Sequence, residues 1–228
     1  MHVDCLTGKS ERHIDWLGEN LGLHQSVVEH WQAMCLAAKA DGIDIAIVSG
    51  FRSFDRQLAI WNAKYQGLRP VKDISNNSVD ISKISTFDRI KAIMLYSALP
   101  GTSRHHWGTD IDVYSPSMLG KDQSLQLEPW EYGADGPFNR LTIWLKKHAG
   151  KFGFYLPYQE YLGGVAPEPW HLSYYPLANE FMSLLTEEVI RQAIAESEIL
   201  GKEEILSVLP SLYNQYITNI SASINHNE

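Results

Sequence analysis

Hydrophobic side chains recur every three or four residues in several stretches of the chain, which is the spacing of one face of an α-helix. Residues that typically start or stop helices bound these stretches, such as Ser53 with Asp55 at one start and Pro100-Gly101 after one end. The pattern predicts helices over residues 25–40, 53–67, 86–99, 139–148 and 186–200, and it continues over residues 202–217.

Short runs rich in β-branched and aromatic residues predict strands between these helices. These runs cover residues 43–48, 111–114 and 152–158. Residues 115–136 are long and rich in turn formers, and we expect this loop to cover a substrate, with Trp130 or Tyr132 making contact. Three tryptophans at helical spacing, Trp31, Trp61 and Trp144, are expected in the core. The mixture of helices and short strands favours an α+β fold with a C-terminal helical extension.

The composition is that of a globular chain with no nucleic-acid or membrane signature. Hydrophobic residues make up 44% of the 228 residues, which is enough to bury a core. Asp and Glu (27) outnumber Lys and Arg (19), giving a formal charge of -8 without any basic run, which argues against nucleic acid or an anionic membrane as the main partner. No apolar stretch approaches the ~20 residues that span a bilayer. Cys5 and Cys35 have neither disulfide-framework nor metal-ligand spacing.

The first residues, Met1 to Cys5, contain neither the basic region nor the apolar core of a secretory signal. We therefore expect a cytoplasmic protein. A chain trimmed of its leader would instead lie in the periplasm or the cell envelope.

The segment from Ser103 to Asp112 concentrates the side chains that bind metal ions. It holds His105 and His106, a glycine, and then Asp110 and Asp112 at the start of a predicted strand. A catalytic zinc takes three protein ligands, often imidazole and carboxylate, and leaves one position for water. If the segment is extended, the two adjacent histidines point in opposite directions, so both should not face one metal. The two aspartates share a face, and spacing alone leaves open which one binds and which one supports.

Two further segments carry complementary chemistry. In Glu168-Pro169-Trp170-His171, a histidine ligand follows three residues after a carboxylate that can deprotonate water. Pro169 disfavours a helical Glu168, so this pair is expected in an extended or turned segment. Arg52 follows a predicted strand and could stabilise an oxyanion or hold a carboxylate.

These three motifs, in this order, resemble the VanY-type D-alanyl-D-alanine carboxypeptidases, within a wider group of zinc peptidases that includes D,D-dipeptidases and L,D-carboxypeptidases. The resemblance covers residues 43–174. It implies that Glu168 is the catalytic base, that Arg52 acts at the scissile carbonyl and binds substrate, and that Gln57 and Ser103 line the substrate site. It implies these zinc ligands: His105, Asp112 and His171.

The resemblance implies a zinc-dependent carboxypeptidase that hydrolyses the terminal D-alanine from peptidoglycan stem peptides or fragments, using a zinc-bound water activated by Glu168. It also implies a small central antiparallel sheet flanked by helices. We expect residues 1–176 to form the zinc peptidase domain and residues 177–228 to form a helical extension packed on it, frayed from Ser221 onward. Asp110 departs from the family pattern, which often has a small apolar residue there. The oligomeric state stays open.

Alternatives remain at this point. An L,D-carboxypeptidase or a D,D-dipeptidase would keep the metal chemistry and change the bond that is cleaved. A non-catalytic module that binds peptidoglycan peptides would keep only the fold, but the intact Glu168 and the complete ligand set speak against it. A serine hydrolase is disfavoured because Ser103 lies in no Gly-x-Ser-x-Gly turn.

Overall fold

The computed structural model describes residues 1–221 of the chain. The helices are α1 (Val3–Leu6), α2 (Val28–Ala40), α3 (Phe54–Tyr65), α4 (Thr86–Met94), α5 (Asn139–His148), α6 (Tyr175–Leu184), α7 (Glu187–Ala195) and α8 (Lys202–Leu212). The strands are β1 (Ile14–Gly18), β2 (Leu21–His24), β3 (Ala46–Ser49), β4 (Asp110–Tyr114), β5 (Phe154–Tyr155) and β6 (His171–Tyr174). β1 and β2 form a hairpin, and the other four strands form an antiparallel sheet in the order β3-β4-β6-β5. The predicted α+β class with a small antiparallel sheet is confirmed.

The two faces of the central sheet differ in chemistry because side chains alternate along β4 and β6. Ile111 and Leu172 are fully buried on one face, in a core that also contains side chains of α2 and α5. Asp112 and His171 face the other way. These two residues are directly paired in the β4–β6 register, so strand pairing alone places a carboxylate beside an imidazole.

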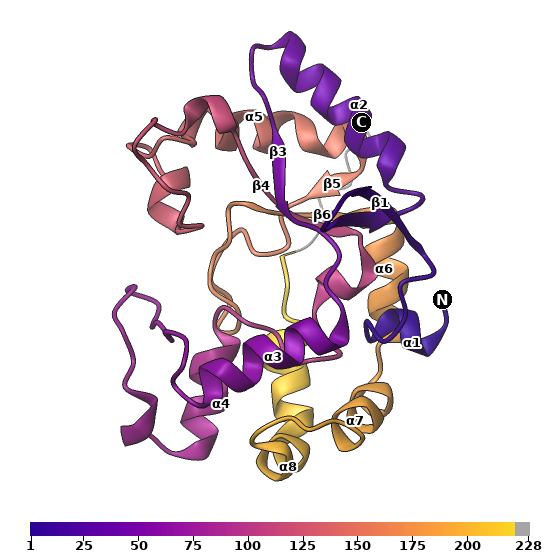
Figure 1. Cartoon of the computed structure of the whole chain (residues 1–228), viewed down its shortest axis with the longest axis vertical. Helices are drawn as coiled ribbons and strands as arrows, with labels where there is room; N and C mark the ends of the chain where they lie inside the picture. Colours follow the sequence, from indigo (N-terminus) through magenta and orange to yellow (C-terminus); the bar gives the residue numbers. More distant parts are fainter. Residues whose placement is uncertain (222–228) are drawn as a thin grey trace.

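A second hydrophobic core lies on the other side of the molecule, among α3, α4, α6, α7 and α8 (Figure 1). Trp61 of α3 is fully buried there, as are Ile194 of α7 and Leu209 of α8. The extension therefore shares its core with helices from the first half of the chain. The domain boundary predicted at residues 176/177 falls inside α6.

Several predicted elements differ from the observed ones. The helix predicted over residues 86–99 ends at Met94, and the carbonyl of Leu95 accepts from the backbone of Ala166 (2.9 Å). The strand predicted over residues 152–158 is only two residues long, between Gly153 with a positive φ and Pro157. The β1–β2 hairpin, β6 and α6 were not predicted. The three tryptophans expected in the core are buried there. Of the tail expected to fray, residues 222–228 lie outside the described part of the chain.

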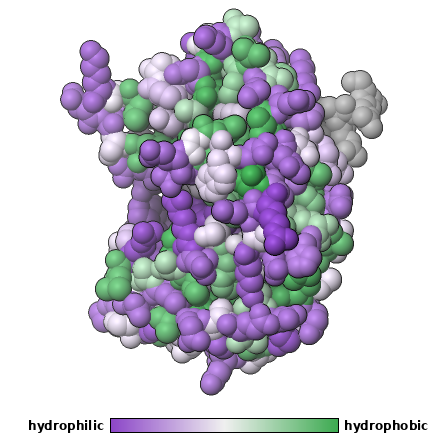
Figure 2. Space-filling model, turned by 45° about the vertical axis from the view of Figure 1, so that its right-hand side comes forward, coloured by the Kyte–Doolittle hydropathy of each residue, from purple (hydrophilic) through white to green (hydrophobic). Residues whose placement is uncertain are grey.

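On the surface, hydrophilic and hydrophobic residues are interspersed, and hydrophilic residues gather around a recess at mid-height of the face in Figure 2. Across residues 1–221, no helix has both the length and the hydrophobicity required to cross a membrane.

Candidate active site

A cleft of about 610 Å³ lies between the polar face of the sheet and the helices of the second core. Its walls come from many parts of the chain, from Arg52 near the start to Ile217 near the end. They include the end of β3, one face of α3, the turn before β4, the loop between β5 and β6, and the segment after α8. Its lining includes Arg52, Lys64, Ser103, Glu168, Tyr216 and Ile217.

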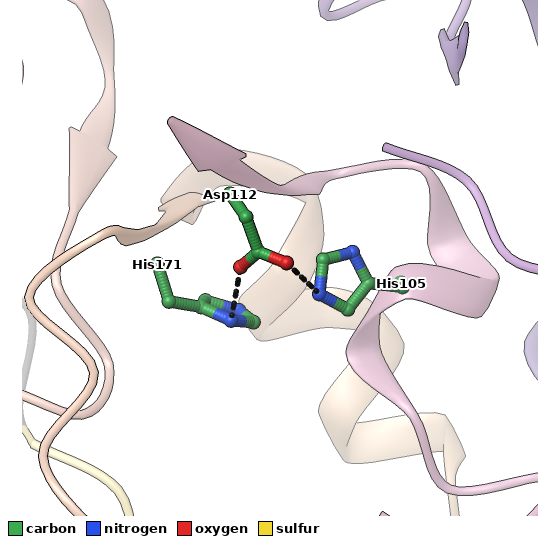
Figure 3. A group of neighbouring side chains, drawn as sticks. All are labelled: His105, Asp112 and His171. Carbon is green, nitrogen blue, oxygen red and sulfur yellow. Dashed lines mark ion pairs between the residues drawn. The ribbon is translucent and has the colours of Figure 1, made fainter. Parts of the chain in front are cut away.

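Three side chains converge at this cleft and could hold a metal ion (Figure 3). One ligand atom from each of His105, Asp112 and His171 lies within 4.8 Å of the other two, and all three residues are buried. The Asp112 carboxylate is shared between the rings. Its Oδ2 lies 3.4 Å from His105 Nε2, and its Oδ1 lies 3.3 Å from His171 Nδ1.

His105 reaches the sheet because the chain reverses just before β4. His105 belongs to a short 3₁₀ helix, Arg104–Trp107, which ends at Gly108 with a φ of 67°. This left-handed conformation favours glycine. A Cβ at Gly108 would also lie 2.6 Å from the backbone nitrogen of His24, so no other residue fits without displacing the hairpin.

The donor atoms are those that a divalent cation such as zinc prefers. His105 Nδ1 lies 2.9 Å from the carbonyl oxygen of Gly50, so it carries the proton and Nε2 keeps its lone pair. His171 Nε2 likewise lies 2.9 Å from Asp110, which leaves Nδ1 facing Asp112. Asp112 Oδ1 is buried without a hydrogen-bond partner in the described chain. Burial lowers the pKa of His105 to about 4, which keeps the ring neutral, as a metal ligand must be. Two imidazoles and one carboxylate match a catalytic zinc site.

Asp110, whose role spacing left open, lies behind His171 and does not belong to the triad. Its carboxylate accepts hydrogen bonds from Arg104 Nε (2.7 Å), from the Thr109 hydroxyl (2.7 Å) and from the Ser173 hydroxyl (3.0 Å). Asp110 and Arg104 are both buried. Although burial opposes it, the attraction of Arg104 holds the pKa of Asp110 far below its usual value. The structure therefore gives Asp110 a supporting position.

His106 faces away from the triad. Its Nδ1 lies 2.6 Å from the carbonyl oxygen of Arg52, and its Nε2 accepts a hydrogen bond of 3.0 Å from the backbone of Gly101. The segment is a 3₁₀ helix, so the condition of an extended chain is not met, but of the two histidines only His105 belongs to the triad.

Glu168 lies at the edge of the triad, in the loop of residues 156–170 that joins β5 to β6. Its Oε2 is 3.2 Å from His171 Nδ1. The backbone nitrogen of Glu168 donates to Tyr158 (2.9 Å), and its carbonyl accepts from the backbone of His171 (3.0 Å), so the residue sits in a tight turn. Burial raises the pKa of Glu168, against the opposing effect of His171. A carboxylate with a raised pKa suits proton transfer near neutral pH.

Arg52 follows β3 and borders the same cleft. Its guanidinium donates to Gln57 Oε1 (3.0 Å) and to Ser49 Oγ (3.0 Å), and it forms no ion pair within residues 1–221. Gln57 was predicted to line the substrate site, but it is fully buried beneath Arg52, with its amide also donating to Ala98 (2.7 Å). Gln57 therefore orients Arg52, while Ser103 lies on the cleft wall.

The long loop over residues 115–136 borders the cleft, but through residues 126–129. The two aromatic residues that the sequence suggested for substrate contact lie elsewhere. Tyr132 is buried in the core and donates to the carbonyl of Val113 (2.7 Å). Trp130 is 55% exposed and its indole donates to Glu128 (2.9 Å), outside the cleft lining.

Lys64 is a cleft residue that the sequence interpretation missed. It lies on α3 one turn after Ile60 and two turns after Gln57, so these three residues share a helix face. Its ammonium group donates to Ser97 Oγ (2.7 Å), and none of the ion pairs in the described part of the chain involves it. Burial lowers the pKa of Lys64 to about 8. The sequence could have indicated Lys64 as a cleft residue, because it lies on the same helix face as Gln57, which the resemblance had placed at the substrate site.

Comparisons with known proteins identify a family and a fold for this chain. The VanY family of D-alanyl-D-alanine carboxypeptidases matches residues 20–177. An uncharacterized protein of Haemophilus influenzae is 40% identical over 121 residues, which are 52% of this chain and 92% of that protein. Two solved structures share the fold. VanYB in complex with D-Ala-D-Ala has a TM-score of 0.52 at 21% identity, covering 81% of this chain and 89% of its own. A variant of the vancomycin-resistance D,D-pentapeptidase VanY in complex with Zn(II) has a TM-score of 0.51 at 22% identity, covering 79% and 92%. With most of its length matched, this chain belongs to the VanY family of D-alanyl-D-alanine carboxypeptidases.

Proposed function

We propose that this chain is a zinc-dependent carboxypeptidase that removes the terminal D-alanine from peptidoglycan stem peptides or their fragments. The observation that carries the proposal is the convergence of His105, Asp112 and His171 in one cleft, with Glu168 at their edge. The family description and the D-Ala-D-Ala bound by a neighbour of the same fold support the choice of substrate.

The chemistry divides between the triad and the groups around it. A zinc ion held by the triad would polarise the scissile carbonyl and lower the pKa of a water molecule. Glu168 accepts a proton from the attacking water and delivers it to the nitrogen of the leaving D-alanine. Arg52, held in place by Gln57 and Ser49, donates hydrogen bonds to the carbonyl oxygen as negative charge develops there.

Lys64 suits a carboxylate of the substrate. Its ammonium group is desolvated in the cleft, and its hydrogen-bond partner, Ser97, is neutral. A partly buried ammonium group with no carboxylate in ion-pair contact is costly, and a substrate carboxylate would supply that contact. A carboxypeptidase substrate always carries such a group.

Replacing Lys64 with methionine should raise KM by about 10-fold or more, because a hydrogen bond to a charged group is worth roughly 1.5–3 kcal/mol. The wild type should show the same loss as the pH rises. The lysine is charged below its pKa of about 8 and neutral above it, so KM should increase as the pH passes through about 8. Steady-state kinetics between pH 6 and 10 would measure both effects.

The exposed Lys146 of α5 offers a matched control, since Lys146→Met removes the same charge away from the cleft. The control should keep the wild-type KM and its pH dependence. A Lys64→Met variant whose KM still rises above pH 8 as in the wild type would contradict this role for Lys64.

The proposed function is tested by bound metal and D-alanine release in the same preparations. The wild type should bind one zinc ion per chain and release D-alanine from a peptide ending in D-Ala-D-Ala. His171→Ala should lose both, because a third ligand is missing, while the exposed His30→Ala should lose neither. Circular dichroism would check that each variant is folded. Turnover by a metal-free His171→Ala variant would overturn the proposal.

Substrate choice within the zinc peptidase group is tested with a panel of peptides. Pentapeptides ending in D-Ala-D-Ala, tetrapeptides ending in a single D-alanine, and the free dipeptide D-Ala-D-Ala represent the D,D-carboxypeptidase, L,D-carboxypeptidase and dipeptidase activities. We expect the pentapeptide to be the best substrate. A clear preference for either of the others would reassign the bond that is cleaved while leaving the metal chemistry intact.

A further inference from the structure

The segment that follows α8 lies along the loop that carries Glu168. This C-terminal segment, residues 213–221, begins with a π-helical turn, Tyr213–Ile217. Figure 1 shows it in yellow, leaving α8 toward the centre of the molecule, where the sheet begins. We call residues 156–170 the Glu168 loop. The two segments lie far apart in the sequence. The C-terminal segment also lies outside residues 20–177, which match the family.

Three hydrogen bonds join the C-terminal segment to the Glu168 loop. Gln215 Nε2 donates to the carbonyl of Gly163 (2.7 Å), and Asn219 Nδ2 donates to the carbonyl of Leu162 (2.8 Å). The backbone nitrogen of Ser221 donates to the carbonyl of Pro157 (2.8 Å). All three acceptors are backbone carbonyls of the loop, so the contacts constrain the path of its main chain.

The two segments are packed so closely that a side chain would not fit between them. A Cβ at Gly164 would lie 2.0 Å from the carbonyl oxygen of Gln215, which is well inside contact distance. On its other side, the loop is held by the backbone of Ala166, which donates to Leu95 at the end of α4 (2.9 Å). The stretch before Glu168 is therefore fixed between α4 and the C-terminal segment.

The C-terminal segment is itself anchored in the second core. Tyr216 and Ile217 are buried with α8, and both also border the cleft, as does Val165 of the loop. The backbone of Gln215 is thus held by the two buried residues that follow it, while its side chain donates to the loop. Such a link matters because the loop has almost no regular secondary structure, and a displacement of about 1 Å in a catalytic group can cost about 100-fold in rate.

We propose that the C-terminal segment is a clamp that positions Glu168, with Gln215 as its main positioning residue. The proposal rests on the proposed function for its catalytic part, since it assigns the clamp to the loop that carries the base. Through Tyr216 and Ile217, the same segment also completes the cleft wall.

The test compares Gln215→Ala and Gln215→Glu with Asn214→Ala. The glutamate has the shape of glutamine but lacks the N–H that donates to Gly163. Asn214 is a neighbouring exposed amide whose side chain donates only to the carbonyl of Pro210 in the preceding helix, α8 (2.9 Å). Hydrogen exchange of residues 156–170, zinc content, kcat and KM are measured for each variant and for the wild type.

Both Gln215 variants should speed hydrogen exchange in the Glu168 loop and lower kcat by about 10-fold, with KM changed by less than about twofold and zinc content unchanged. Asn214→Ala should match the wild type in every measurement. A general loss of structure would instead speed hydrogen exchange throughout the chain. Faster exchange confined to residues 156–170, together with a lower kcat at an almost unchanged KM, therefore indicates that Gln215 positions the loop and does not merely stabilise the protein.

Two outcomes would overturn the clamp. One is exchange in residues 156–170 that is as slow in the Gln215 variants as in Asn214→Ala. The other is faster exchange with an unchanged kcat, which would show that the loop is held but that Glu168 does not depend on it. Hydrogen exchange needs no substrate. If the wild type released no D-alanine, the proposed function would be refuted, but the exchange data would still show whether the C-terminal segment holds the Glu168 loop.

Discussion

Replacing Glu168 with glutamine should lower kcat by about 100- to 10,000-fold, which is the usual contribution of a general acid–base. The amide keeps the size of the carboxylate but cannot accept a proton from water. Zinc binding should survive, because Glu168 is not part of the triad and its Oε2 lies only at the edge, 3.2 Å from His171 Nδ1. D-alanine release and zinc per chain, measured on the same sample, would show both effects.

Glu160 provides the control for this prediction, because it is an exposed glutamate in the same loop. Glu160→Gln removes the same charge from the same segment and should leave kcat unchanged. If Glu168→Gln bound zinc and kept full turnover, the assignment of the catalytic base would be wrong, and another group at the cleft would have to move the proton.

Replacing Asp110 with asparagine should destabilise the protein by about 3–5 kcal/mol, the cost of leaving one partner of a buried ion pair uncompensated. Arg104 and Asp110 are both buried and 2.7 Å apart, so the asparagine would strand the guanidinium away from water. Zinc affinity should also fall by about 10- to 100-fold, because His171 would lose the carboxylate that orients its ring. Urea unfolding of the metal-free protein and a competition titration with a chelator would measure the two effects.

A double variant separates these two roles of Asp110. Arg104→Met combined with Asp110→Asn removes both charges, so much of the lost stability should return. Zinc affinity should stay low, because His171 still lacks its partner. A double variant that regained wild-type zinc affinity would show that Asp110 does not act on the metal site through His171.

The parts of the fold that the sequence predicted are those with a strong local signal. α3 begins where Ser53 caps it, with the serine hydroxyl accepting from the backbone of Arg56 (3.3 Å), and α5 has the predicted bounds. The β1–β2 hairpin was missed because four of the five residues of β1 are exposed, so hydrophobic and polar positions do not alternate along it. β1 is held by its pairing with β2, which is not a local property.

The candidate site shows the same division. The sequence motifs indicated four site residues, and the structure brings all four together: His105, Asp112, His171 and Glu168. Lys64 was missed because a lysine on an amphipathic helix usually reaches solvent, and only the packing of α4 and the loops around it makes this one a cleft residue.

By itself, the sequence determined the kinds of metal-binding side chain and the strand parity that sets Asp110 and Asp112 on one face. The tertiary structure decided between the two aspartates. The register of β4 against β6 pairs Asp112 with His171, while the buried guanidinium of Arg104 forms an ion pair with Asp110. Strand parity follows from the local geometry of the backbone, but the register joins residues about 60 positions apart, which no local pattern encodes. Arg104 is only six positions from Asp110, but its burial beside that carboxylate depends on the tertiary packing.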